Sequence, residues 1–189
     1  MEDRWSTPIE RRASTDVGGS GPTIWFTGLL SAVNTTPASA VADRLRRRST
    51  RVEVLDGDVV RTHLTSDLGF SREDRRENVR RIGFVVHLLS RNGVVVVCAL
   101  ISPRREDRDE VRSLHGSRFF EVYVSAPVEG CAELDVSGLY ARQRVGTLRA
   151  LSGNQDPYEA TLDREGVVPS QRQTVDQSVD QIWRALSAS

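Results

Sequence analysis

Residues 23–36 read TIWFTGLLSAVNTT, and the fold of this chain can be worked out from this stretch. The stretch begins with the apolar residues 24–26, a short run that is typical of a buried strand. The run ends near Gly28, and a helical pattern follows Pro37. Thr36 is a suitable N-cap, and proline suits the first position of a helix. The stretch therefore predicts a buried strand, a loop and a helix, in that order.

A strand followed by G-x-x-x-x-G-K-[ST] and a helix is the phosphate-binding P-loop. Gly28 and Thr35 match the first glycine and the final Ser/Thr, but Val33 replaces the second glycine and Asn34 replaces the lysine. Glycine lets the loop backbone curl around phosphate oxygens, whereas a β-branched residue disfavours positive φ. Asparagine offers only a neutral amide, and all 26 Lys+Arg residues are arginine. The predicted late start of the helix at Pro37 also departs from a working P-loop.

Composition indicates an ordinary soluble protein. The chain has 189 residues, a net charge of zero, 28% charged residues and 38% hydrophobic residues, which suits one domain. We expect no nucleic-acid partner, because there is no basic excess, and no membrane segment or signal peptide. Two cysteines give no disulfide framework, with Cys98 expected in the core, and the three histidines are widely separated. A reduced, cytoplasmic protein without a metal cluster is the expectation.

The pattern along the chain is one of alternating strands and helices. Residues 1–22 are polar and predict a flexible arm, and residues 23–187 predict a single domain. Strands are expected at residues 23–27, 51–55, 94–100, 119–124 and 167–168. Helices are expected at residues 38–48, 71–91, 104–114 and 174–186, with short ones at 128–135 and 138–143 and a flap at 145–163.

This alternation predicts an α/β fold, with a parallel sheet between two layers of helices. Ligands of such sheets bind at the carboxyl ends of the strands. Those ends carry Gly28, residues 56–58 and residues 101–102, so the sequence places these residues along one edge.

Short strings that follow these strands resemble the adenylylsulfate kinase family. They are DGDVVR (56–61), LGFS (68–71), Asp74, Arg75, Asn78, RIG (81–83), NG (92–93), ISP (101–103), Arg108, GLYAR (138–142) and DPYE (156–159). The resemblance spans about residues 20–187. It implies a P-loop NTPase-like fold of the nucleoside-kinase type, with three α/β/α layers and a lid at about residues 138–163. It also implies a role in sulfate assimilation: phosphorylation of the 3′-hydroxyl of adenosine 5′-phosphosulfate (APS) with ATP and Mg²⁺.

The resemblance also implies roles for single residues. Asp58 would act as base or magnesium organiser, supported by Asp56. The APS-binding residues would be Arg61, Phe70, Arg75, Asn78, Ile101, Ser102 and Leu139, with Phe70 stacked on the adenine. The ATP-binding residues would be Gly28, Ser31, Asn34, Thr35 and Thr36, with the Thr35 hydroxyl on the magnesium side. APS or a related adenine nucleotide would be the ligand, and a homodimer is the implied assembly.

The residue types suit the APS half of this site. The planar fork of arginine matches phosphate and sulfate oxygens, and Arg75 and Asn78 are three residues apart, on one helix face. A plainer interpretation also exists. The arginines of helix 71–91 would then form a solvated face paired with Glu73, Asp74 and Glu77, and Asp56 and Asp58 would merely cap a turn.

The ATP half departs from the family at further positions. Ser137 stands where the family has a lysine, Arg104 where it has a tyrosine, and residues 148–153 lack the lysine and aromatic residue expected in the lid. Phosphoryl transfer depends on positioning and charge, so losing these cations should slow it by several factors of ten, at about 10²–10³ for each well-placed donor.

We therefore hypothesise a pseudokinase that retains the APS site while ATP-dependent transfer is weak or lost. The alternatives are an active divergent kinase and a transferase that uses APS with a different second substrate. An active kinase needs a replacement cation, such as Arg104, Arg142 or Arg149. In a purely structural alternative, Phe70 and the arginines would form a protein interface.

Overall fold

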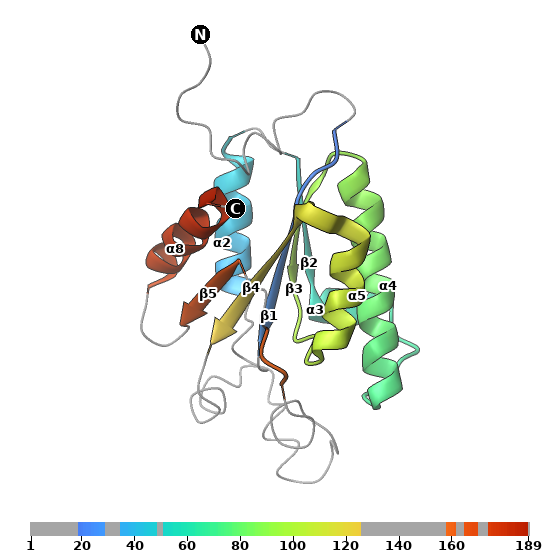
Figure 1. The fold of residues 1–189 in the computed structure, drawn as a ribbon. Coiled ribbons are helices and arrows are strands. Elements are labelled where there is room, and N and C mark those ends of the chain that lie inside the picture. The colour runs from blue at the N-terminus through green and yellow to red at the C-terminus, as the bar shows by residue number, and fades with distance from the viewer. Residues whose placement is uncertain are drawn as a thin grey trace.

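The structure is a computed structural model that describes residues 19–28, 35–48, 51–125, 158–161, 165–169 and 174–188. Its strands are β1 (Thr23–Gly28), β2 (Val52–Asp56), β3 (Val95–Ala99), β4 (Phe119–Ser125) and β5 (Gly166–Pro169). Its helices are α2 (Thr35–Arg46), α3 (Gly57–His63), α4 (Arg72–Arg91), α5 (Arg105–His115) and α8 (Val175–Ala188), with a 3₁₀ turn at Gly116–Arg118. Figure 1 shows these elements in order along the chain.

The sheet is parallel throughout, in the order β2-β3-β1-β4-β5. Because all five strands run the same way, their carboxyl ends lie along one edge, which we call the rim. At the rim Ala99 is in register with both Phe26 and Asp56, so the ends of β1, β2 and β3 are neighbours. The predicted α/β fold with a parallel sheet is confirmed.

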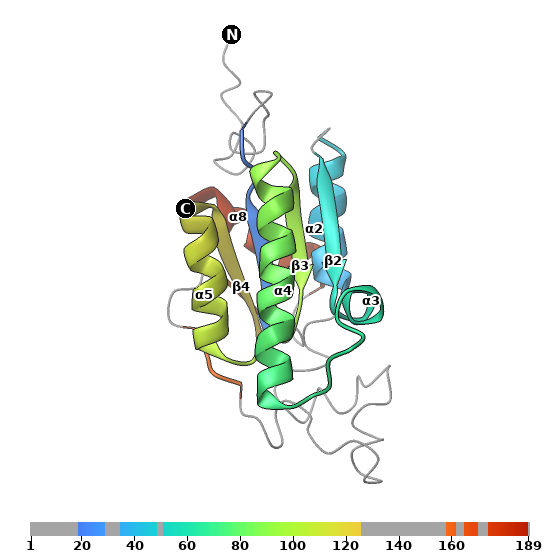
Figure 2. The same ribbon diagram turned by 90° about the vertical axis from the view of Figure 1, so that its right-hand side faces the viewer.

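Helices cover both faces of this sheet, as Figures 1 and 2 show. Successive side chains of β1 alternate between the faces, as a strand requires. Ile24 and Phe26 pack with buried residues of α2 and α8, whereas Trp25 packs with buried residues of α3, α4 and α5. The result is the three-layer α/β/α arrangement that the sequence predicts, with a hydrophobic core on each side. Cys98 is buried in the second core, as expected.

Helix α4 begins with a capping box and lies close against α5. Ser71 is its N-cap: the Ser71 hydroxyl accepts from the Asp74 N–H, and the Asp74 carboxylate accepts from the Ser71 N–H. Gly83 allows the close approach, because a Cβ there would lie 2.6 Å from a methyl carbon of Val111 on α5. The long helix that leads away from the rim is therefore fixed at its start and along its side.

Three details differ from the sequence prediction. Helix α2 starts at Thr35, so Pro37 is its third residue. The first N–H groups of a helix have no partner within the helix, so proline costs no hydrogen bond there. Helix α3 was not predicted, and it begins directly after Asp56, in a string that we interpreted as a turn. The last helix, predicted at residues 174–186, begins at Val175 and continues to Ala188.

Several predictions lie outside the described residues. They are residues 1–18 of the arm predicted at residues 1–22, the short helices at 128–135 and 138–143, and most of the flap at 145–163. Among the helices that the structure describes, none combines the length and apolar character needed to cross a membrane.

Candidate functional site

Helix α3 follows β2 at the rim, as Figure 2 shows. Asp56 is the last residue of β2, and Asp58 is the second residue of α3. One carboxylate oxygen of Asp56 accepts from the backbone N–H of Asp58, at 2.9 Å, and from that of Val59. Asp56 is thus the N-cap of helix α3, whereas the plainer interpretation had Asp56 and Asp58 capping a turn. The same bond fixes the backbone of Asp58, whose side chain is exposed. Capping by Asp56 therefore presents Asp58 to solvent at the rim.

Arg61, Phe70 and Arg75 come together beside this point, although they belong to three segments. Nη1 of Arg61 donates to the carbonyls of Leu68 and Gly69, at 3.0 and 2.9 Å. The Arg61 guanidinium carbon lies 4.3 Å from the centre of the Phe70 ring. Nε of Arg75 donates to the Phe70 carbonyl at 3.0 Å, and its guanidinium carbon is 5.9 Å from the same ring. Two arginines thus hold one aromatic residue and its loop.

This cluster has the chemistry for an anionic ligand with an aromatic part. Phe70 is 41% exposed, so its ring offers apolar surface beside two positive charges. Burial lowers the pKa of Arg61, and the carboxylates of Asp74 and Asp58 partly offset that shift. An arginine stays protonated in proteins, so both cations persist.

Arg80 and Arg81 on α4 belong to the solvated face that the plainer interpretation described, whereas Arg76 pairs with acidic residues of α5. Arg80 and Arg81 both bind Glu77, and Arg81 also binds Asp67. Arg75 differs from them, because it is only 8% exposed. Asn78, one turn further along, accepts a hydrogen bond from the Thr65 hydroxyl at 2.7 Å. The structure thus separates Arg75 and Asn78 from the solvent-facing arginines.

Ile101 and Ser102 follow β3 and are tied to β1. The Thr27 hydroxyl donates to the Ile101 carbonyl at 2.7 Å and lies 2.9 Å from the Ser102 hydroxyl. The Ser102 hydroxyl also accepts from the Trp25 indole N–H at 3.0 Å. Ser102 is 4% exposed and has a φ of 37°, in the left-handed region. Its side chain is thus used within the protein, and the turn at this point has a strained, well-held backbone.

Sequence reasoning missed the buried charges behind this turn. Arg108 on α5 is fully buried and contacts Glu121 on β4, which is buried as well. The spacing contained a signal: Arg108 lies three residues before the core residue Val111, on the inner face of its helix. Strand alternation likewise places Glu121 on the same face of the sheet as Phe119. Charged residues on two inward faces predict a buried ion pair.

Two histidines also meet, although the sequence suggested three separate ones. The rings of His87 and His115 are edge to face, 5.3 Å apart, between α4 and α5. Burial lowers the pKa of His115. Within the described residues no group of three potential metal-binding side chains exists.

Several predicted site residues cannot be placed with the others. Ser31, Asn34 and Leu139 lie outside the described residues, as does the side chain of Thr35. Gly28 ends β1 at the rim, and Thr36 is exposed in the first turn of α2.

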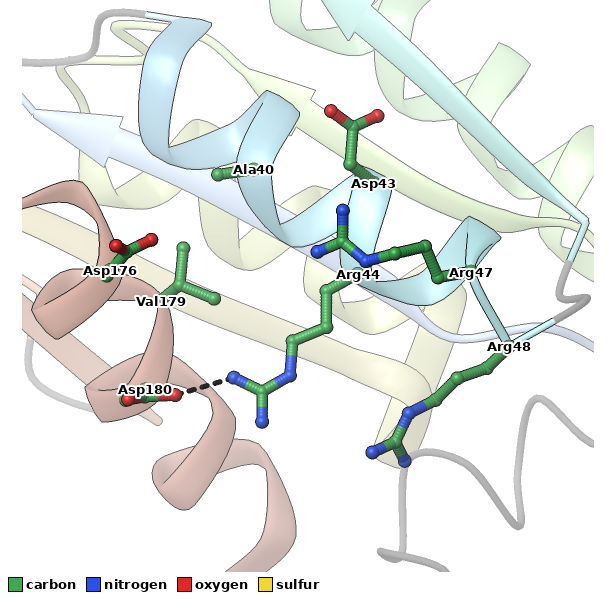
Figure 3. A pocket seen from close by; sticks show the side chains of 8 residues that line it. All are labelled: Ala40, Asp43, Arg44, Arg47, Arg48, Asp176, Val179 and Asp180. Atoms are coloured by element: carbon green, nitrogen blue, oxygen red, sulfur yellow. Dashed lines mark hydrogen bonds and ion pairs between the residues drawn. The ribbon is translucent and has the colours of Figure 1, made fainter.

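A separate pocket of about 560 Å³ lies between α2 and α8 (Figure 3). It is lined by Ala40, Asp43, Arg44, Arg47, Arg48, Asp176, Val179 and Asp180, so none of the predicted site residues that are described line it. Arg44 binds Asp180 at 2.6 Å, and the guanidinium groups of Arg44 and Arg48 lie over the Trp183 ring. The arginines near the end of α2 thus join the two helices.

The chain is similar to known proteins over most of its length. The model of the adenylylsulphate kinase family matches residues 20–168. The adenylyl-sulfate kinase of Picosynechococcus sp. is 48% identical over 167 residues, which cover 88% of this chain and 94% of that protein. The adenylyl-sulfate kinase of Rippkaea orientalis is 50% identical over 166 residues, with 88% and 91% covered.

Solved structures agree with the fold. The APS kinase of Mycobacterium tuberculosis, solved in complex with AMPPNP and APS, has a TM-score of 0.83 at 35% identity, and 88% of this chain and 98% of that chain are covered. A gluconokinase from Sinorhizobium meliloti, at 14% identity and a TM-score of 0.60, shares only the fold, with 88% and 92% covered. The α/β architecture is thus that of the P-loop NTPases, and the chain belongs to the adenylylsulphate kinase family.

Proposed function

We propose that this chain binds adenosine 5′-phosphosulfate at the rim of its sheet, and that it transfers phosphate from ATP weakly or not at all. The observation that carries the proposal is the contact of Arg61 and Arg75 with the exposed Phe70 ring. APS combines an adenine, which stacks on an aromatic ring, with a phosphosulfate, which binds arginine. The cluster offers both kinds of contact within one loop and two helices.

The other described residues at the rim suit the same ligand. The turn at Ile101 and Ser102 would form one wall of the proposed APS pocket at the rim. Asn78 would add an amide on the face of α4 that carries Arg75. Asp58 is exposed and held at its backbone by Asp56. It would lie near the 3′-hydroxyl of bound APS and could accept its proton.

The residues that should bind ATP differ from those of a complete P-loop. A triphosphate with Mg²⁺ needs glycine-rich backbone and a lysine, and this chain has Val33 and Asn34 at those positions and no lysine. The residues present therefore do not fit the nucleoside triphosphate well. Because positioning and charge supply most of the catalysis of phosphoryl transfer, we expect little turnover.

A second candidate is an active but divergent adenylyl-sulfate kinase. Its support is the 48–50% identity to proteins of that name over most of the chain. In that case an arginine would take over the charge of the missing lysine.

A product assay separates the two candidates. Purified protein is incubated with APS, ATP and Mg²⁺, and formation of 3′-phosphoadenosine 5′-phosphosulfate is followed by chromatography. A family member with the complete G-x-x-x-x-G-K-[ST] loop serves as the positive control. We expect a rate at least about 10³-fold below that control, because the loss of one or two hydrogen-bond donors to the transition state slows a reaction by about that factor. A rate within tenfold of it would establish the active kinase instead.

A further inference from the structure

Arg108 connects three segments of the chain from a fully buried position. Its Nε donates to Glu121 Oε1 on β4 at 2.8 Å, and its Nη1 donates to the Ser102 carbonyl at 2.8 Å. Its Nη2 donates to the Glu159 carbonyl at 2.7 Å and to the Thr161 hydroxyl at 3.1 Å. One planar side chain thus joins the sheet, the turn after β3 and residues 158–161, which belong to the predicted lid.

Stability alone does not explain such an arrangement. Burying an ion pair removes two charges from water, and apolar side chains of similar size often serve stability as well or better. The fork of arginine, in contrast, fixes several acceptors in one plane. Glu121 keeps the fork oriented, because it accepts from Arg108 and from the Thr161 hydroxyl. The pair therefore fits a role in fixing geometry.

The turn that Arg108 holds is the strained one. Ser102 has a φ of 37°, which a residue with a Cβ adopts rarely. The Thr27 hydroxyl donates to the Ile101 carbonyl at 2.7 Å and lies 2.9 Å from the Ser102 hydroxyl. The Tyr158 hydroxyl donates to the same Thr27 oxygen at 3.1 Å. Residues 158–161 therefore reach the turn twice, through Arg108 and through Thr27.

We propose that Arg108 is a positioning residue that makes the turn at Ile101 and Ser102 and residues 158–161 one unit at the rim. Replacing the guanidinium of Arg108 removes the hydrogen bonds to the Ser102 carbonyl and to the Glu159 carbonyl together. The turn then relaxes from its strained conformation, and the wall of the APS pocket moves with it. The affinity part of this inference rests on the proposed function.

The test compares Arg108→Lys with Arg112→Lys as a matched control. Arg112 lies one turn along α5 and also contacts Glu121, and it binds Glu165 as well. Amide hydrogen exchange is measured by mass spectrometry on the ligand-free variants. We expect faster exchange both at residues 101–105 and at residues 158–161 in Arg108→Lys, and at neither in Arg112→Lys. Unchanged exchange at either segment in a folded Arg108→Lys protein would overturn the proposal.

APS titration gives the second readout. We expect APS affinity to fall about tenfold, or 1.4 kcal/mol, in Arg108→Lys and to stay unchanged in Arg112→Lys. Equal affinity in both variants would mean that Arg108 has only a structural role. If the unmodified protein binds no APS, the proposed function fails, and the exchange measurement still decides the coupling.

A second variant covers the case in which Arg108→Lys does not fold. Arg108→Met combined with Glu121→Leu removes both buried charges together, which proteins often tolerate. It should show the same faster exchange at the two segments. Native exchange there would contradict the proposal.

Discussion

At the scale of single residues, the cluster around Phe70 depends on how the two arginines are held. Arg75 uses Nε on the Phe70 carbonyl, and Arg61 uses Nη1 on the carbonyls of Leu68 and Gly69. These bonds fix the position of each guanidinium beside the Phe70 ring. An anion that approaches Phe70 would thus meet two positive charges whose positions are already fixed.

Replacing Arg75 by alanine should weaken APS binding by roughly 10- to 100-fold, the value of one or two hydrogen bonds to a charged group. Arg61→Ala should behave in the same way. Arg80→Ala is the matched control, because Arg80 lies on the same helix and forms an ion pair with Glu77 on the solvent side. Titration calorimetry measures the affinities. Equal affinity in all three variants would favour a protein interface, with loss of a partner rather than of APS.

At the scale of elements, α4 connects the predicted APS site to the core. Its N-cap Ser71 directly follows Phe70, and its inner face carries the buried residues Val79, Ile82 and Val86. The capping box thus fixes the point at which the Phe70 loop becomes helix.

Ser71→Ala should lower the free energy of unfolding by about 1 kcal/mol, because the Asp74 N–H loses its acceptor. Urea denaturation followed by circular dichroism measures the change. Ser113→Ala on α5 is the control, since that exposed hydroxyl donates only to a carbonyl of its own helix, and its effect should stay within about 0.5 kcal/mol. A Ser71→Ala protein as stable as the control would show that the cap contributes nothing.

Acidification should lower the stability of the folded protein by protonating Glu77 on α4. Hydrogen bonds from Arg80 and Arg81 lower the pKa of Glu77 to about 2. A carboxyl group with a lowered pKa stabilises the folded state above its unfolded pKa, and that contribution is lost as the pH falls through the folded value. The melting temperature should therefore fall less in Glu77→Gln than in the unmodified protein between pH 4.5 and pH 2. Because the pair is exposed, the difference should be small and shrink in 1 M salt. An equal fall in melting temperature with pH for Glu77→Gln and the unmodified protein at low salt would contradict this prediction.

The sequence was sufficient for elements whose pattern is local. The cap at Ser71 and the apolar period of α4 are readable without tertiary information, and the helix predicted at residues 71–91 is confirmed at Arg72–Arg91. Helix α3 was missed because it has only seven residues and begins within the Asp-Gly-Asp string at residues 56–58, which equally suits a turn. Spacing marks Arg108 and Glu121 as inward-facing, but their contact with each other depends on where α5 packs relative to β4, which no local pattern specifies. The roles of Arg61 and Phe70 came from the family resemblance rather than from spacing.

At the scale of the whole molecule, the described rim favours binding of APS, whereas the sequence of the P-loop disfavours binding of ATP. The described rim brings Arg61, Phe70 and Arg75 into one cluster beside Asp58. The loop that should hold ATP contains Val33 and Asn34 in place of glycine and lysine. A chain of this family with such a loop should keep one ligand and lose the other.

Restoring the loop should restore ATP binding. Val33→Gly combined with Asn34→Lys returns the flexible position and the charge of the motif. Calorimetry with ATP and Mg²⁺ should then show a binding heat that the unmodified protein lacks. Val33→Ala with Asn34→Gln is the control, because it changes both positions without either property. A restored variant that behaves like this control would place the defect elsewhere in the chain.

The most direct measurement of the central claim is paired titration calorimetry of the unmodified protein, with APS in one experiment and with ATP plus Mg²⁺ in the other. We predict APS binding at micromolar concentration and no heat with ATP. Absence of APS binding at that concentration, or ATP binding as tight as that of APS, would contradict the account.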